Sequence, residues 1–190
     1  MKKLSAWINT ISTGWVTLIG LVIFLLFTAL VLPSQAEGAD TYSGETGSPD
    51  TSFYYSADTL YQFADAYGPE GRRAYIQARV TFDVIWPLIY LAFLATSISW
   101  AFQKAGRVGG GWARLNLAPV FGLILDYLEN VTTVVVMARY PDPTPILASL
   151  AGLFTALKWV FIGGSFAILV IALGMAGWRY ARLKLAGTDA

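Results

Sequence analysis

The chain has 190 residues and a net charge of +1, and with 56% hydrophobic and 13% charged residues it is too apolar for a typical soluble domain. It contains neither cysteine nor histidine, which excludes disulfides, thiolate nucleophiles, Ser/His/Asp triads and typical zinc, copper or haem sites, so we expect no cofactor and no metal. The small net charge gives no broad basic field, so nucleic acid is not an expected partner.

Four apolar segments are long enough to cross the hydrocarbon core of a bilayer, which needs about 20 helical residues. They lie at residues 14–32, 80–102, 115–138 and 146–177. The fourth is longer than required, so we expect it to tilt or to project its first turns beyond the membrane. None of the four shows the alternating pattern of a barrel strand. The sequence therefore predicts an all-α membrane protein with a single transmembrane domain, folded as a four-transmembrane-helix bundle.

Lysine and arginine set the predicted orientation. Most of them cluster at the amino end, between the second and third spans, and in the carboxyl tail, which all lie on one side of a four-span chain. Arg72, Arg73 and Arg79, just before the second span, are exceptions. The positive-inside rule assigns that side to the cytoplasm. We therefore expect a multi-pass protein of the cell membrane with both termini cytoplasmic. The basic residues that carry this prediction are Lys2, Lys3, Lys104, Arg107, Arg114, Arg179, Arg182 and Lys184.

The first span has a second interpretation as a cleavable signal peptide. Lys2 and Lys3 would be its charged start, and the small residues at 34–36 its cleavage site. The apolar run is longer than the roughly 7 to 15 residues of a signal core, which favours an uncleaved anchor.

The predicted outer loop, residues 33–79, divides in two by composition. Residues 37–52 are rich in Gly, Ser, Thr, Asp and Glu and predict a flexible connection. Residues 56–67 predict an amphipathic helix, because Ser56 can cap it and apolar residues recur at helical spacing. A further helix is expected to begin at Pro69 and to continue unbroken into the second span.

Three arginines, Arg72, Arg73 and Arg79, lie on the first turns of that further helix, at the predicted level of the lipid headgroups. They have two interpretations. Long basic side chains anchor a helix by reaching into the headgroup region, or they bind a phosphate or carboxylate group. The second interpretation makes them headgroup-binding residues.

Ionisable residues inside the spans are the most informative feature of the sequence. A charged side chain at mid-bilayer costs about 2.5 to 3.5 kcal/mol, so such residues face the bundle interior and often mark function. In the third span, polar residues recur at i, i+3, i+4 and i+7 and so share one helical face. The predicted intramembrane polar or ligand-binding site consists of Asp83, Tyr90, Asp126, Glu129, Asn130, Thr133, Thr155 and Lys158.

Charges in this site do not balance. At a rise of about 1.5 Å per residue, the polar faces meet in the outer half of the membrane, where Lys158 would pair with Asp126 or with Glu129. Three carboxylates then face one ammonium group. A carboxyl group could keep its proton, an arginine could reach down to Asp83, or a cation or cationic ligand could complete the site.

Three functions of different classes fit these features. The first is a binding module or small lipid-modifying enzyme that holds a lipid or small apolar ligand in an outer-leaflet polar pocket. The second is a structural or accessory subunit, whose partners would be other membrane subunits or further copies of this chain. The third is a proton or cation pathway with Glu129 and Asp126 as relay carboxylates. Catalysis itself stays open, and Glu129 is the expected base if there is any.

Overall fold

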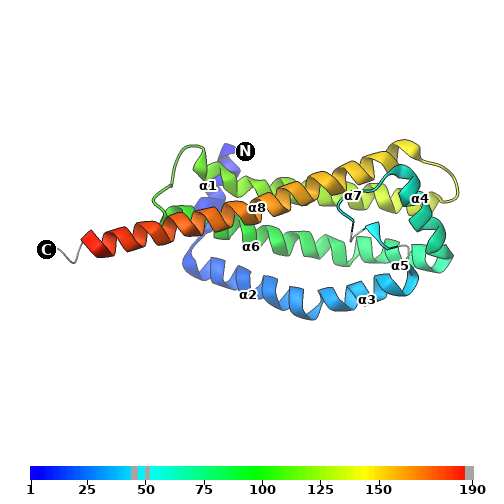
Figure 1. Ribbon diagram of the computed structural model, residues 1–190, viewed down its shortest axis with the longest axis horizontal. Helices are drawn as coiled ribbons and strands as arrows, with labels where there is room; N and C mark the ends of the chain where they lie inside the picture. The colour runs from blue at the N-terminus through cyan, green and yellow to red at the C-terminus, as the bar shows by residue number, and fades with distance from the viewer. Residues whose placement is uncertain (44–46, 50–51, 187–190) are drawn as a thin grey trace. The chain divides into compact units, whose positions relative to one another are not determined.

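The computed structural model describes residues 1–43, 47–49 and 52–186. Every element within these ranges is helical, and Figure 1 shows the order in which they follow one another. The helices are α1 (Lys2–Ile11), α2 (Gly14–Leu30), α3 (Leu32–Ser43), α4 (Ala57–Ala66), α5 (Gly68–Val80), α6 (Phe82–Lys104), the 3-10 helix η3 (Trp112–Leu117), α7 (Ala118–Arg139) and α8 (Pro145–Ala186).

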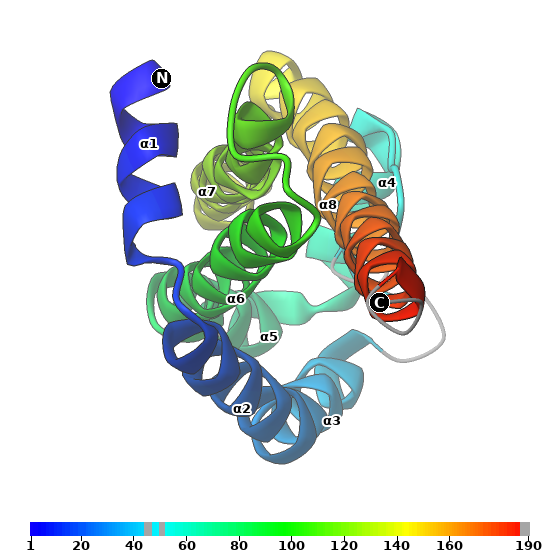
Figure 2. The same cartoon turned by 90° about the vertical axis from the view of Figure 1, so that its left-hand side faces the viewer.

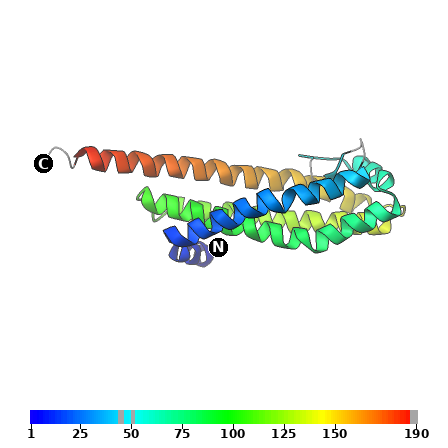
Figure 3. The ribbon, with the colours of Figure 1, turned by 90° about the horizontal axis from the view of Figure 1, so that it is seen from below.

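Four helical stretches among the described residues are long and apolar enough to cross a membrane. They are Gly14–Gln35, Gly68–Lys104, Trp112–Arg139 and Pro145–Ala186, and each contains one of the spans predicted from the sequence. The last of them is a single unbroken helix, α8 (Figure 3). By length and composition, the chain is thus an all-helical, multi-pass membrane protein.

Helix α3 differs from the prediction. Residues 37–52 read as a flexible connection, but α3 extends to Ser43, so the first part of that segment is helical. The physical reason is propensity: Ala36, Glu37 and Ala39 are good helix formers that can continue a helix already begun in an apolar segment. Residues 44–46 and 50–51 of the predicted connection lie outside the described residues.

Helix α4 begins where the sequence predicts a helix start. Ser56 is its N-cap, with extended backbone and a side chain that accepts a hydrogen bond of 3.1 Å from the Thr59 backbone N–H. Leu60, Phe63 and Ala64 bury one face of the helix. That this helix lies in an outer loop stays a prediction.

The expected unbroken helix from Pro69 into the second span is interrupted at Thr81. Helix α5 ends at Val80 and α6 begins at Phe82. The Thr81 backbone N–H bonds to the Ala78 carbonyl oxygen, three residues back instead of four, and the Thr81 hydroxyl donates a 2.6 Å hydrogen bond to the Gln77 carbonyl oxygen in its place. This interruption lies between Arg79 and Asp83, two residues of the charged cluster described below.

The chain divides into two compact units, and α2, α6, α7 and α8 contribute to both. The first unit comprises Met1–Phe24, Ile89–Phe121 and Phe161–Ala190. In it, α1 lies beside η3 (Figure 2), where the Ser5 hydroxyl donates a 2.7 Å hydrogen bond to the Ala113 carbonyl oxygen. The Asn116 side chain returns a hydrogen bond to the Ser5 carbonyl oxygen. Helix α1 lies outside the predicted spans.

The second unit comprises Leu25–Leu88 and Gly122–Val160. Its apolar core joins the buried face of α4 to residues from α5, from the end of α7 and from the start of α8. Tyr55, which precedes α4, belongs to this core and is 2% exposed. The buried members of the core are Tyr55, Leu60, Phe63, Ala64, Tyr67, Tyr75, Val136, Met137, Ala148 and Ala151. The candidate site lies in this unit.

Candidate functional site: a buried charged cluster

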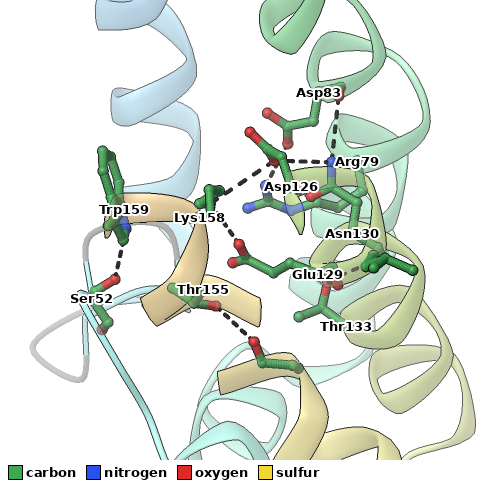
Figure 4. Close-up of polar contacts among 12 residues, drawn as sticks. Ser52, Arg79, Asp83, Asp126, Glu129, Asn130, Thr133, Thr155, Lys158 and Trp159 are labelled. Carbon is green, nitrogen blue, oxygen red and sulfur yellow. Dashed lines mark hydrogen bonds and ion pairs between the residues drawn. The ribbon is translucent and has the colours of Figure 1, made fainter. Parts of the chain in front are cut away.

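The charged cluster of the second unit gathers side chains from four helices. Helix α5 contributes one residue, α6 one, α7 four and α8 two, and Figure 4 shows Lys158 pointing toward the carboxylates of Asp126 and Glu129. All of them are buried, although five carry ionisable groups. The members are Arg79, Asp83, Asp126, Glu129, Asn130, Thr133, Thr155 and Lys158.

Helix α7 separates its polar and apolar residues as the predicted spacing requires. The polar stripe from Asp126 to Thr133 is buried, and Glu129 and Thr133 have no exposed surface. The opposite side presents Leu128 and Val131 on the outside of the structure. A helix with one buried polar stripe and one exposed apolar side matches a membrane, where lipid contacts the apolar side.

Lys158 of α8 is shared between two carboxylates of α7. Its Nζ lies 2.6 Å from Glu129 Oε2 and 3.9 Å from Asp126 Oδ1. The sequence left the partner open between these two residues, and the structure brings both to the ammonium group with unequal distances. The shorter contact makes the Glu129 pair the stronger one.

Arg79 of α5 reaches into the cluster as a second cation. Its Nη1 lies 2.6 Å from Asp83 Oδ2 and donates a longer hydrogen bond of 3.3 Å to Asn130 Oδ1. The guanidinium also lies 4.5 Å from the centre of the Tyr75 ring, in a cation–π contact. One of the alternatives left open by the sequence, an arginine that reaches Asp83, is therefore the observed arrangement.

Asn130 connects the two ion pairs. Its side-chain nitrogen donates to Asp126 Oδ1 at 3.5 Å and to the Asp83 carbonyl oxygen at 3.4 Å, and its oxygen accepts from Arg79. These bonds are long, which indicates weak individual contacts. Together they make the pair on α5 and α6 continuous with the pair on α7 and α8.

Tyr55 closes the Glu129 side of the cluster. Its hydroxyl accepts a 3.1 Å hydrogen bond from the Thr155 hydroxyl of α8. Burial raises the pKa of the Tyr55 hydroxyl above its ordinary value, and the negative charge of nearby Glu129 raises it further. Tyr55 is therefore a neutral hydroxyl beside a buried carboxylate.

The two carboxylate oxygens of Glu129 differ in their contacts. Oε2 forms the ion pair with Lys158. Oε1 is buried and accepts no hydrogen bond of standard geometry from the described residues, although the Tyr55 hydroxyl lies near enough to this carboxylate to interact with it. A buried acceptor without a donor is costly, so this atom marks where a proton, a water molecule or a ligand donor would be stabilised.

The other predicted residues have different environments. Arg72 donates a 2.7 Å hydrogen bond to the Ala64 carbonyl oxygen and lies over the Tyr140 ring at 4.8 Å, whereas Arg73 is exposed. Arg79 is buried with Asp83, so the three arginines of the headgroup prediction are not equivalent. Tyr90 is buried within the first unit.

The sequence analysis did not predict that Tyr55 lies beside Glu129 in the cluster. The segment before α4 has no periodic pattern, so periodicity does not distinguish the buried Tyr55 from its exposed neighbour Tyr54. Its one signal is position: an aromatic residue immediately before the capping serine packs back against the helix that follows.

No protein-family model matches this chain, and comparisons with the curated proteins and with the solved structures found no match. The arguments for function therefore rest on the charged cluster itself.

Proposed function

We propose that this chain is a multi-pass protein of the cell membrane, a four-helix bundle with both termini in the cytoplasm. Four apolar helical stretches support the bundle. The basic residues at the amino end, around Lys104 and in the tail support the orientation, because positively charged segments are retained on the cytoplasmic side. Helix α4 would then lie in the first outer loop.

Within this bundle, we propose that the charged cluster binds a proton and forms part of a proton pathway. The single observation that carries the proposal is the charge count. Among the described members of the cluster, Asp83, Asp126 and Glu129 supply three carboxylates, and Arg79 and Lys158 supply two cations. One negative charge is left over in a buried environment, where an uncompensated charge is costly. A bound proton makes the cluster neutral.

The proposed relay uses Glu129 and Asp126 as alternating proton carriers. Lys158 Nζ is 2.6 Å from one and 3.9 Å from the other, so a small movement of the lysine side chain changes its partner. When Glu129 takes up a proton at Oε1, its attraction for Lys158 falls and the ammonium group moves to Asp126. When Asp126 is protonated instead, Lys158 returns to Glu129. The Tyr55 hydroxyl lies beside Glu129, one of the two proposed proton carriers.

Proton flux into liposomes tests the relay. Purified protein would be reconstituted with a pH-sensitive dye inside the vesicles, and an imposed pH difference would drive the flux. We expect the Asp126→Asn and Glu129→Gln variants to lose the flux, because each removes one of the two carriers. Arg73→Gln is the matched control, because Arg73 is an exposed residue of the same unit. Equal flux in all four proteins would refute the relay.

A second candidate is the binding of a lipid or small apolar ligand that carries a hydrogen-bond donor. Glu129 Oε1, buried and without a hydrogen bond from the described residues, is the observation that favours it. Native mass spectrometry in mild detergent would compare the protein with Glu129→Gln. A discrete adduct that only the unaltered protein carries would support this candidate. If neither protein carries an adduct while both are folded, the ligand proposal fails.

The third candidate is a structural or accessory subunit, favoured by the fact that the ion pairs connect α5, α6, α7 and α8. In this case the cluster holds the helices together and no flux or adduct is observed. Lowered thermal stability in every charge variant, with no flux in any of the proteins, would be its signature.

A further inference from the structure

The first unit carries a separate cleft of about 500 Å³ between the residues that follow α6 and the last turns of α8. Arg107, Arg179 and Arg182 line it, together with Trp178 and apolar residues. We propose that this cleft binds the phosphate group of an anionic phospholipid. The proposal is independent of the proton pathway, because none of these residues belongs to the charged cluster of the second unit.

The turn that ends α6 builds one wall of the cleft. Gly106 has a positive φ of 75°, its N–H bonds to the Gln103 carbonyl oxygen, and the Arg107 N–H bonds to the Phe102 carbonyl oxygen. This pair of bonds is the Schellman motif, a common end for a helix. It fixes the backbone of Arg107 directly after the helix, so this arginine enters the cleft from a defined turn.

Arg179 of α8 is held against the same turn. Its Nη1 donates a 3.1 Å hydrogen bond to the Lys104 carbonyl oxygen at the end of α6. A Cβ atom on Gly106 would lie 2.7 Å from this Nη1, so the glycine leaves the space that the guanidinium occupies. Arg182 follows one turn later on the same face of α8. A guanidinium carries five N–H donors, so the bond to Lys104 leaves others for a phosphate.

The lining favours an anion such as phosphate over a cation. Three guanidinium groups contribute positive charge, and no carboxylate is among the described residues that line the cleft. Arginine binds phosphate through paired N–H donors, which gives both charge and geometric complementarity. The cleft therefore fits a phosphate-bearing anion and not a cation.

Apolar residues beside the arginines indicate a lipid as the source of the phosphate. Met175, Trp178 and Leu183 line the cleft with the arginines. Trp178 is exposed, and tryptophan is enriched where a membrane meets water. Helix α8 has 42 residues, hence a length of about 63 Å against a hydrocarbon core of about 30 Å, so it extends beyond the core. The predicted cytoplasmic side is also where anionic lipids gather.

Lipid titration by native mass spectrometry tests this site. The protein in mild detergent would be titrated with phosphatidylglycerol, with phosphatidylcholine and, separately, with inorganic phosphate. We expect discrete binding of phosphatidylglycerol that Arg107→Gln/Arg182→Gln weakens by about tenfold or more, because two arginine–phosphate contacts are lost. Lys2→Gln/Lys3→Gln, which removes the same charge from residues that do not line the cleft, should retain the affinity.

Three outcomes would overturn the proposal. Equal loss in both double variants would mean that net charge alone attracts the lipid. Equal affinity for phosphatidylcholine would mean that the site does not select an anionic lipid. Tight binding of inorganic phosphate that displaces the lipid would assign the cleft to free phosphate. If the Arg107→Gln/Arg182→Gln variant melts earlier, the exposed single variant Arg182→Gln supplies the same comparison.

Discussion

Gly152 of α8 lies directly against the backbone carbonyl oxygen of Tyr55. A Cβ atom built on this glycine would overlap the Tyr55 oxygen and also approach the Tyr54 ring. The close approach brings the segment before α4 onto α8, one turn before Thr155, whose hydroxyl donates to the Tyr55 hydroxyl. The glycine thus determines how deeply Tyr55 enters the cluster.

Gly152→Ala is expected to displace Tyr55 and to lower the thermal stability of the protein in detergent. Alanine is the better helix former by about 1 kcal/mol, so helix propensity alone predicts the opposite sign. Gly163→Ala is the matched control, because it lies in the same helix and a Cβ there would meet no atom within 4 Å. The control should keep or raise the melting temperature. If both variants behave alike, the Tyr55 contact does not contribute to stability.

Lys158→Met is expected to destabilise the protein more than Glu129→Gln does. The lysine variant leaves three carboxylates with Arg79 as their one cation among the described members of the cluster. The glutamine variant leaves two carboxylates and two cations. Loss of the lysine should lower the free energy of unfolding by roughly 1 to 3 kcal/mol. The double variant Glu129→Gln/Lys158→Met should recover part of this loss. Thermal melts of the three variants measure the difference, and the reverse order would contradict the charge count.

Local sequence patterns were sufficient to predict the spans and seven of the eight members of the cluster. Long apolar runs identify membrane-crossing helices whatever their packing, because a bilayer requires about 20 apolar residues in each helix. The polar stripe that begins at Asp126 follows from helical periodicity alone. Its burial was predictable because exposure of Glu129 to lipid is costly.

The places of Arg79 and Tyr55 depend on features of the fold that helical periodicity does not reveal. Arg79 reaches Asp83 across the interruption at Thr81, and no periodic pattern predicts where a threonine will break a helix. Tyr55 enters the cluster because Gly152, almost a hundred residues later, leaves space for its backbone. Arg79 and Asp83 are four residues apart, whereas the contact between Tyr55 and Gly152 does not appear in any local window of sequence. The charge count changed because Arg79 joins the cluster, whereas the sequence placed this residue at the headgroup level and left open whether an arginine reaches Asp83.

Arg79→Gln is expected to cost roughly 1 to 3 kcal/mol of stability, because it leaves Asp83 buried without its ion pair and removes the contact with the Tyr75 ring. Arg73→Gln, six residues earlier on an exposed position of the same helix, should change stability by less than about 0.5 kcal/mol. Adding Asp83→Asn to Arg79→Gln should restore part of the loss. Equal melting temperatures for the two single arginine variants would show that the buried ion pair contributes nothing to stability.

The Tyr55 hydroxyl predicts how stability depends on pH in alkaline solution. Its pKa in the folded protein is raised above the ordinary value of 10.0, mainly by burial and further by Glu129. Above about pH 10, the unfolded chain loses this proton while the folded chain keeps it, so stability falls as the pH rises. Below pH 10 both states keep the proton and the contribution is constant. Tyr55→Phe cannot ionise and should show a smaller loss between pH 9 and pH 11 than the unaltered protein. Thermal melts of both proteins at these two pH values measure this difference. An identical pH dependence in both would mean that Tyr55 ionises as readily in the folded protein as in the unfolded one.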